Sequence, residues 1–246
     1  MGSGSWTSAR QPRAADVPGE LIGSGRSADV YEHEPGWVLR RYREPRDTER
    51  EVAGMEHARA HGFPAPEARA LSDTEIVMRR LEGPTMLDDL GRRPWMIGRH
   101  AATLATLHRR LHEIEAPDWL PTPLGEGKAM LHLDLHPDNV ILTSTGPGLI
   151  DWTNVARGPG AADVAYTSIV LTTAGAPRDD LRTRVTTNVG RRLFLRAFLG
   201  NFDRAERAEA EALVPIGAAV RLEDRVVPPE EHAKIARLAR PNGLDV

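Results

Sequence analysis

Three polar side chains in the middle of the chain have the types and the spacing that chemistry on phosphate groups requires. Asp134 and Asn139 stand five positions apart in a polar loop, and Asp151 follows Asn139 by twelve residues. The apolar runs 140–142 and 148–150 predict two short paired strands with a turn at 144–147. Such a hairpin would bring Asn139 and Asp151 to the same end.

Phosphoryl transfer is the reaction that this set of residues suits. Its transition state spreads negative charge over the phosphate oxygens, so a protein mainly positions groups and holds metal ions. Mg²⁺ takes oxygen ligands from one or two protein groups, and Asn139 and Asp151 offer such oxygens. Asp134 would orient the acceptor hydroxyl and accept its proton. A role in turns and caps is the simpler interpretation of each residue alone, but it does not explain why all three occur at this spacing.

The order of these motifs resembles the protein-kinase set, and the details are closer to the aminoglycoside phosphotransferase-like family of small-molecule kinases. In that family the loop reads His-Gly-Asp-Leu-His-x-x-Asn, against His-Leu-Asp-Leu-His-Pro-Asp-Asn over residues 132–139 here. Asp151 followed by Trp152, and the run 157–159 leading to Asp163, also match. The resemblance covers about residues 20–175.

This resemblance implies an α+β fold of the two-lobed protein-kinase-like type. A small antiparallel β N-lobe with one helix would span 20–83, and a larger helical C-lobe 84–246, with 1–19 as a flexible segment. Residues 77–83 resemble the hinge, so ATP or GTP would bind between the lobes beside Met78 and Leu81. Asp163 would be structural and would hold the catalytic loop.

A glycine-containing stretch near the start of the N-lobe supports nucleotide binding more weakly. Residues 23–30 match a kinase glycine-rich loop, except that Ala28 replaces the third glycine. Backbone N–H groups of such a loop approach phosphates closely, although an ordinary hairpin turn is the alternative. The residues predicted to contribute are Gly23, Ser24, Gly25, Ser27 and Val30.

The phosphate-binding cation is where the chain departs from the family pattern. The family expects Lys on the third strand, and this chain has Arg40 there, with Glu51 favoured over Glu49 as its acidic partner. Arginine can bridge phosphates and a carboxylate, but its planar fork is not interchangeable with an ammonium group. Lysine occurs only at positions 128 and 234, which makes such a replacement plausible.

Two histidines flank Asp134. His132 is expected to support the loop through hydrogen bonds. His136 is grouped with Asp134 in the predicted catalytic set, because protein kinases carry a cation at that position that touches the moving phosphate; a loop-bracing role is the alternative. A zinc site is not expected here, because no matching fourth ligand lies nearby in the sequence.

Strands are expected at 20–22, 28–32, 37–42, 67–71 and 75–80, and a helix at 48–61. Helices are expected beyond Gly83 at 95–114, 161–173, 179–199, 205–213, 215–225 and 229–240. Trp95, Trp119 and the apolar stripe of helix 95–114 are predicted to be core.

Composition narrows the partners and the compartment. The 246 residues carry a net charge of −3 and no cysteine, so a nucleic acid or an anionic membrane is a poor default partner. The absence of disulfides fits a cytoplasmic protein, and no apolar run reaches the length of a membrane span. A monomer or a homodimer is expected.

The acceptor is the least determined part of the function. A small-molecule hydroxyl, on an antibiotic such as an aminoglycoside or on a metabolite, is the leading prediction. The near balance of charge in the last third disfavours a strongly cationic acceptor, although an acidic pocket could form from Asp179, Asp180, Glu223 or Asp224. The alternatives are a nucleotide-binding pseudokinase acting as an interaction module and, last, a kinase for proteins, for which residues 152–163 are a short activation segment.

Overall fold

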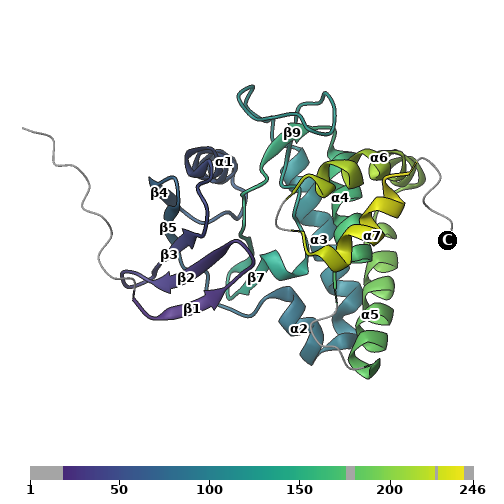
Figure 1. Cartoon of the computed structure of the whole chain (residues 1–246), viewed down its shortest axis with the longest axis horizontal. Helices are drawn as coiled ribbons and strands as arrows, with labels where there is room; N and C mark the ends of the chain where they lie inside the picture. Colours follow the sequence, from purple (N-terminus) through teal and green to yellow (C-terminus); the bar gives the residue numbers. More distant parts are fainter. Residues whose placement is uncertain (1–18, 176–180, 225–226, 241–246) are drawn as a thin grey trace, which may run out of the picture.

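The computed structural model describes residues 19–175, 181–224 and 227–240, and for residues 181–186 it describes the backbone only. A small antiparallel sheet with one helix forms one end of the molecule, and helices form the other (Figure 1). The predicted division into a β-rich part and a helical part is confirmed.

The sheet has five strands in the order β1-β2-β3-β5-β4, and neighbouring strands are antiparallel. Apolar residues of its two central strands are buried, among them Leu39, Ile76 and Val77, as expected for strands that pack a helix on one face. The strands are β1 (Leu21–Ser24), β2 (Ala28–Glu32), β3 (Trp37–Tyr42), β4 (Ala68–Ser72) and β5 (Glu75–Arg79).

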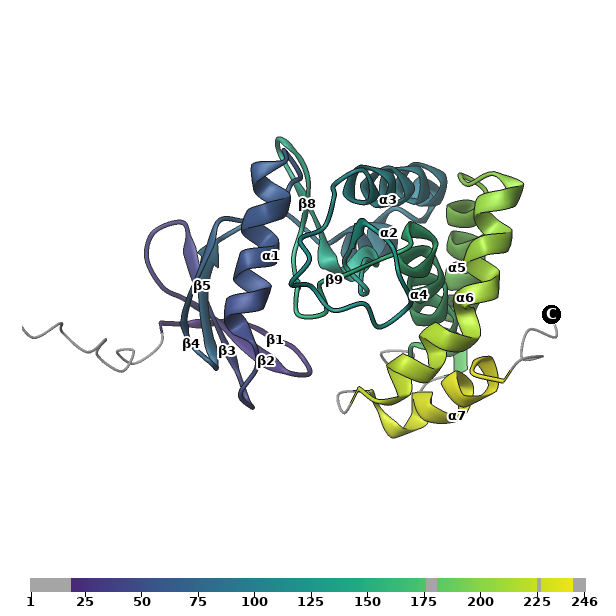
Figure 2. The ribbon, with the colours of Figure 1, turned by 90° about the horizontal axis from the view of Figure 1, so that it is seen from above.

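Helix α1 (Thr48–Ala60) packs between the sheet and the rest of the molecule (Figure 2). The Asp47 side chain caps its first turn by accepting from the Arg50 N–H at 3.0 Å, a common N-terminal signal. Gly54 lets helix α1 approach Val155 closely, because a Cβ at position 54 would lie 2.9 Å from the Val155 side chain. This contact fixes the position of Glu51, on the same helix, relative to Val155.

The helical part is built around α4, which is mostly apolar and is buried along most of its length, as expected for a central helix. Leu104, Leu107 and Leu111 of α3 are fully buried as predicted. The helices are α2 (Met86–Arg92), α3 (Ile97–His112), α4 (Gly160–Thr173), α5 (Leu181–Leu199), α6 (Arg204–Leu222) and α7 (Pro229–Leu238).

Two short strand pairs carry the loops of interest. Strand β7 (Val140–Thr143) pairs with β8 (Gly146–Leu149), which confirms the predicted hairpin. Strand β6 (Ala129–Leu131) pairs with β9 (Ala156–Gly158). Gly83, at φ +150°, lies so close to the Leu142 carbonyl that there is no room for a side chain at position 83. We keep Gly83 as the proposed boundary between the lobes.

Several expectations about the helical part were wrong. The two helices expected at 205–213 and 215–225 are one helix, α6, which continues through Pro215. Proline removes one helical hydrogen bond, but Val214 and Ala218 on either side of it are buried in the core. Packing therefore holds the helix together. Helix α2 was not anticipated. The start of the helix expected at 179 lies outside the described residues.

Trp95 and Trp119 are surface residues, contrary to the prediction that both belong to the core. Trp95 is 75% exposed and Trp119 is 52% exposed. Trp95 lies in the short 3₁₀ turn η1 (Pro94–Met96) ahead of α3, so it precedes the stripe that the helix buries. The aromatic side chains of both residues suggested burial, but their positions in the fold leave them exposed.

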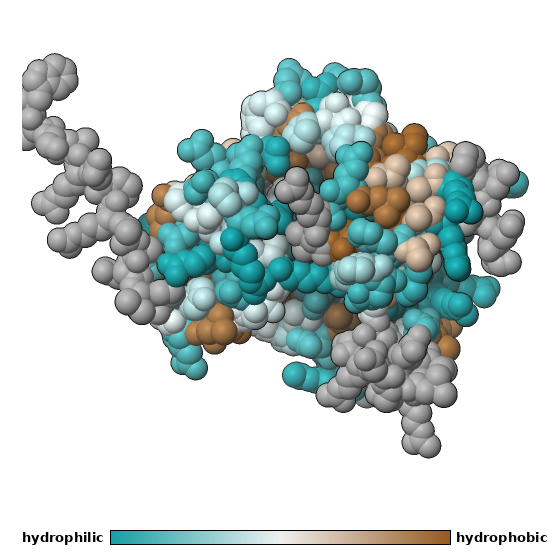
Figure 3. All heavy atoms as spheres, in the orientation of Figure 1, coloured by the Kyte–Doolittle hydropathy of each residue, from teal (hydrophilic) through white to brown (hydrophobic). Residues whose placement is uncertain are grey.

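Hydrophilic side chains cover most of the face of the sheet end in Figure 3, and hydrophobic residues gather in separate small groups. Within the described ranges, no helix combines the length and the apolarity that crossing a bilayer requires.

Candidate active site

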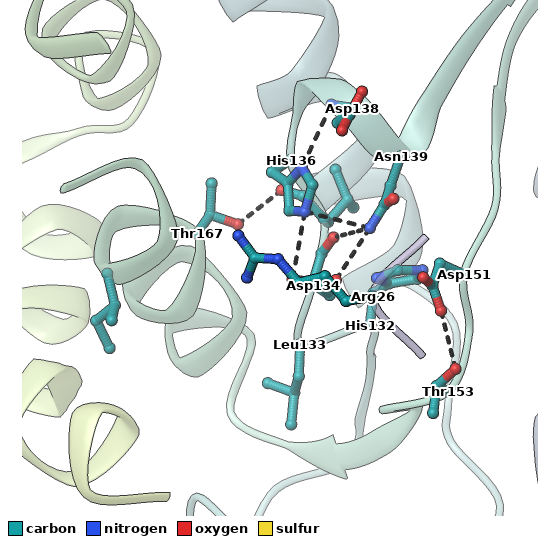
Figure 4. Close-up of polar contacts among 12 residues, drawn as sticks. Arg26, His132, Leu133, Asp134, His136, Asp138, Asn139, Asp151, Thr153 and Thr167 are labelled. Carbon is teal, nitrogen blue, oxygen red and sulfur yellow. Dashed lines mark hydrogen bonds and ion pairs between the residues drawn. The ribbon is translucent and has the colours of Figure 1, made fainter. Parts of the chain in front are cut away.

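The catalytic loop folds so that Asp134 and Asn139 face each other. The Asn139 side-chain amide donates to the Asp134 carboxylate at 3.1 Å and to its backbone carbonyl at 2.9 Å. The short 3₁₀ helix η2 (Pro137–Asn139) produces this approach by turning the chain directly after His136 (Figure 4). Because the amide nitrogen is engaged with Asp134, the amide oxygen is the atom that Asn139 can offer to a cation.

His136 lies against the same carboxylate. Its Nε2 is 3.4 Å from Asp134 Oδ1, and its Nδ1 accepts from the Asp138 N–H at 3.3 Å. Burial lowers the pKa of His136, but the Asp134 carboxylate outweighs it, and the pKa is raised above its usual value. The ring therefore both braces the loop and places a protonatable group beside Asp134.

A buried carboxylate fixes the backbone ahead of Asp134. Leu133 adopts φ +55°, which is unfavourable for a branched side chain. Asp163 of α4 accepts from the Leu133 N–H at 2.7 Å and from the His132 N–H at 3.1 Å. These bonds hold a strained conformation of the kind that active sites retain. The geometry agrees with the structural role that the sequence predicted for Asp163.

Three residues gather possible metal-ligand atoms within 4.8 Å of one another: His108, His112 and Asp163. The Asp163 carboxylate already accepts two backbone N–H groups, and His112 Nε2 lies 3.2 Å from it. Burial raises the pKa of Asp163, but His112 and His108 outweigh it and hold this pKa well below its usual range. We interpret the group as a structural anchor for the loop.

His108, a member of this anchor, makes the stability of the folded protein dependent on pH. Burial lowers the pKa of His108 to about 3, against about 6.5 in an unfolded chain. Below pH 6.5 the unfolded chain therefore binds more protons than the folded protein, and the free energy of unfolding falls as pH falls from about 6.5 toward about 3. We expect His108→Gln to make this decline shallower, by up to about 1.4 kcal/mol per pH unit.

Urea unfolding of both proteins at a series of pH values measures this slope. The exposed His232 offers a matched control, and His232→Gln should keep the wild-type slope. Equal slopes for wild type and His108→Gln would contradict the expectation.

Asp151 follows β8 with a positive φ of +65°. The Ile150 N–H donates to the Asn139 carbonyl at 3.0 Å, so Asn139 and Asp151 do lie at one end of the hairpin. His132 Nε2 lies 3.1 Å from the Ile150 carbonyl and adds a second tie. Carboxylate and amide oxygens are the ligands that Mg²⁺ prefers, and the donor set therefore fits that ion.

Arg40 contacts both acidic residues that the sequence associated with phosphate and metal. Its Nη2 donates to Asp151 Oδ1 at 2.7 Å, and its Nη1 donates to Glu51 Oε1 at 3.4 Å. The predicted Arg40–Glu51 pair is thus formed across β3 and α1. Burial alone would raise the pKa of Asp151, but Arg40 outweighs it, and this pKa is lowered. Burial raises the pKa of Glu51 against the opposing charge of Arg40.

Two hydroxyl groups complete this network, and the sequence analysis missed both. Tyr42 donates to Glu51 Oε2 at 2.5 Å, and Thr153 donates to Asp151 Oδ1 at 2.8 Å. The two hydroxyls are 3.0 Å apart. Tyr42 stands two positions after Arg40 and Thr153 two positions after Asp151. A search of these positions for hydroxyl groups would have found them.

The glycine-containing loop joins β1 to β2. The Gly25 N–H donates to the Ala28 carbonyl at 2.8 Å, and the Arg43 N–H donates to the Ser27 carbonyl at 3.0 Å. Ser24 donates to Asp29 at 2.6 Å and is thereby engaged with the loop itself. Gly23 is a strand residue of β1 with only ordinary contact to Val30.

The other predicted nucleotide contacts come from the sheet and the hinge. Val30 is partly buried in β2, directly opposite Arg40 in register. Met78 is buried in β5. Leu81 packs on the β7–β8 hairpin, where a Cβ at Gly148 would lie 2.6 Å from its side chain. Leu81 therefore lies against the hairpin that leads to Asp151, while the sheet places Val30 beside Arg40.

The profile of the phosphotransferase enzyme family, APH, matches residues 19–129 and 123–209. This chain belongs to that family. The resemblance stated from the motifs is confirmed, and so is the prediction that the protein is a phosphotransferase. No curated protein matches this phosphotransferase.

Solved structures share the fold of this phosphotransferase at low identity. A choline/ethanolamine kinase family protein from Mesorhizobium loti matches at a TM-score of 0.58 and 16% identity, covering 91% of this chain and 88% of its own. The streptomycin–ATP–APH(2″)-IIa complex matches at 0.53 and 14%, covering 94% and 88%. Amicoumacin kinase hAmiN, in complex with AMP-PNP, Ca²⁺ and Ami, matches at 0.53 and 15%, covering 93% and 87%. These likenesses confirm the two-lobed kinase-like fold.

Proposed function

We propose that this phosphotransferase moves the γ-phosphoryl group of ATP to a hydroxyl of a small molecule. The observation that carries the proposal is the convergence of Asp134, Asn139 and Asp151 around one loop and one hairpin. Asn139 bonds to Asp134, and Ile150, the residue before Asp151, bonds to Asn139. The three side chains thus occupy adjoining positions, which supports their proposed roles as a base and two oxygen ligands in phosphoryl transfer.

Each residue of this set has one task in the proposal. Asp134 orients the acceptor hydroxyl and accepts its proton as the oxygen attacks phosphorus. Asn139 and Asp151 would hold Mg²⁺, which would neutralise charge on the phosphates. His136, with Nε2 3.4 Å from Asp134 Oδ1, helps to hold that carboxylate in place. Arg40, fixed by Glu51, positions the nucleotide phosphates.

The proposal of ATP and a divalent cation also draws on the structural neighbours. One neighbour is a ternary complex with ATP and streptomycin, and another contains AMP-PNP and Ca²⁺. The nucleotide would lie under the 23–28 loop, with Val30, Met78 and Leu81 beside the base. The small molecules named for the neighbours range from ethanolamine to gentamicin and amicoumacin, and fold likeness does not choose among them.

A second candidate function rests on the Arg40–Asp151 ion pair. At 2.7 Å this pair places an arginine on the proposed metal ligand, an arrangement that would suit a nucleotide-binding pseudokinase. Arg40 and Thr153 both donate to Oδ1 of Asp151, which leaves Oδ2 to bind a cation. We therefore prefer the catalytic proposal.

The test is a coupled nucleotide-turnover screen with Mg²⁺. ATP and GTP are each paired with aminoglycosides, other hydroxylated antibiotics, amino alcohols, sugars and hydroxy acids, and nucleotide binding is measured in parallel by calorimetry. We expect turnover that depends on both the cation and one class of acceptor. Tight binding of nucleotide without turnover on any acceptor would favour the pseudokinase, and no nucleotide binding would defeat both proposals.

A further inference from the structure

A buried arginine on α6 stands beside the proposed base. Arg221 is only 6% exposed, and its Nη1 lies 4.0 Å from Asp134 Oδ1. Its guanidinium lies over the ring of Tyr166, 5.5 Å from the ring centroid. Residue 221 lies outside the part of the chain on which the sequence motifs fall, and the family motifs assign it no role.

One donor of Arg221 has no hydrogen-bond partner within the described ranges, although Tyr166 interacts with the guanidinium. Its Nε is buried there without a hydrogen-bond partner. Its nearest acidic neighbours, Glu231 Oε2 at 3.8 Å and Asp134 Oδ1 at 4.0 Å, are beyond hydrogen-bond distance. A buried guanidinium with an unpaired donor is costly for a fold to retain. An oxyanion that accepts from Nε and an Nη together would satisfy that donor.

The two oxygens of the Asp134 carboxylate face different neighbours. Oδ2 accepts from Asn139 at 3.1 Å, on the side of the proposed metal ligands. Oδ1 faces His136 at 3.4 Å and Arg221 at 4.0 Å. An acceptor hydroxyl bonded to Oδ1 would therefore carry its neighbouring substituent toward Arg221.

Two further arginines lie close to Glu231 and Gly175. Arg26 of the glycine-containing loop reaches Glu231 of α7 at 3.0 Å, and its side chain overlies the catalytic loop in the view of Figure 4. Glu231 is 1% exposed and also accepts from the Gly175 N–H at 3.0 Å. Arg191 donates to the Gly175 carbonyl at 2.7 Å. Burial lowers the pKa of Arg191, and Arg26 adds to that lowering while Glu231 opposes it.

We propose that Arg221, with Arg26 nearby, forms a subsite for a carboxylate or phosphate group on the acceptor, next to the hydroxyl that receives the phosphoryl group. The acceptor is accordingly an anionic alcohol, such as a hydroxy acid or a phosphorylated polyol. A cationic group at this position would meet the guanidinium at close range. The inference rests on the proposed function, because it assumes that Asp134 binds the acceptor hydroxyl.

The acidic groups near this subsite are Asp134 and Glu231. Asp134 is bonded to Asn139 through Oδ2. Glu231 is paired with Arg26 through Oε1, and its Oε2 is buried without a hydrogen-bond partner, 3.8 Å from Arg221. Two arginines therefore lie beside two carboxylates here, and the Nε of Arg221 is the donor that a negative group on the acceptor would satisfy.

The test compares four alcohols with the same three-carbon skeleton: glycerate, glycerol 3-phosphate, glycerol and 3-aminopropane-1,2-diol. Binding to the full chain is measured by calorimetry, with Mg²⁺ and a non-hydrolysable ATP analogue and again without them. We expect one or both anions to bind at least about tenfold more tightly than the amine, and Arg221→Gln to weaken anion binding about tenfold to a hundredfold. The anion that binds better identifies the group.

Matched variants keep the result interpretable. Arg207, exposed on the same helix, provides the control Arg207→Gln, which should bind as wild type does. Arg221→Lys retains the charge without the fork and carries the test if Arg221→Gln does not fold; it should lose severalfold in anion affinity. The inference would be overturned if the amine bound best, if all four probes bound equally, or if neither anion bound. It would also be overturned if substitution of Arg221 left anion binding unchanged. Nucleotide binding and turnover report separately on the proposed function.

Discussion

Replacing Asp134 by Asn should lower kcat by about 10² to 10⁴ while leaving nucleotide affinity nearly unchanged. The asparagine side chain has almost the same shape as the carboxylate and can still accept the 3.1 Å hydrogen bond from Asn139. What it loses is the ability to take the proton of the acceptor hydroxyl. The measurement is steady-state turnover with the acceptor found in the screen, together with calorimetric binding of the Mg²⁺–nucleotide complex.

Asp138 provides the matched control for this substitution. It lies on the same loop, its side chain is exposed, and its contact with His136 is made through its backbone N–H. Asp138→Asn should therefore retain turnover within a few fold. If Asp134→Asn kept wild-type kcat, Asp134 would not be the base, and the proposed mechanism would have to be abandoned.

Replacing Arg40 by Met should destabilise the folded protein by about 3–5 kcal/mol. Arg40 is 8% exposed and lies between Glu51, which is 1% exposed, and Asp151. Removing the guanidinium leaves the Glu51 carboxylate buried without its cation. Burial raises the pKa of Glu51 and Arg40 opposes that rise, so the ionised carboxylate is destabilised when Arg40 is lost. Urea unfolding monitored by circular dichroism measures the change in the free energy of unfolding.

Two further variants separate the buried ion pair from a general effect of losing an arginine. Arg40→Met combined with Glu51→Gln should be less destabilising than the sum of the two single changes, because the double variant no longer leaves the Glu51 carboxylate buried without its cation. Arg59→Met breaks an exposed pair with Glu56 at 3.4 Å and should cost no more than about 1 kcal/mol. Additive effects at positions 40 and 51 would show that the two side chains are not energetically coupled.

The Arg40 network also bears on the metal site. Asp151 is at once the proposed cation ligand and a partner of Arg40 at 2.7 Å. Binding of a divalent cation to this carboxylate competes with the guanidinium for Oδ1 or uses the other oxygen. Arg40 makes its two contacts from two nitrogens of its fork, whereas a lysine at position 40 would have to reach both carboxylates from one nitrogen.

The sequence by itself determined the parts of the site that lie close together in the chain. Asp134 and Asn139 belong to one loop, and the β7–β8 hairpin ties Asp151 to Asn139 through neighbouring backbone bonds. Short strands and turns follow local rules of residue type and spacing, so such geometry can be predicted from a window of about twenty residues. The pairing of Arg40 with Glu51 was predictable for a similar reason, because one strand and the following helix carry both.

Only the tertiary structure decided the rest. Arg221 reaches Asp134 because α6 packs on α4, and Arg26 reaches Glu231 because α7 folds back toward the glycine-containing loop. Neither approach leaves a pattern along the chain, since the partners are separated by 87 and 205 residues in sequence. Packing likewise carried α6 through Pro215 and left Trp95 at the surface. In each case the stabilising energy comes from the packing of particular faces against one another in three dimensions. Residue type alone does not determine which faces pack together.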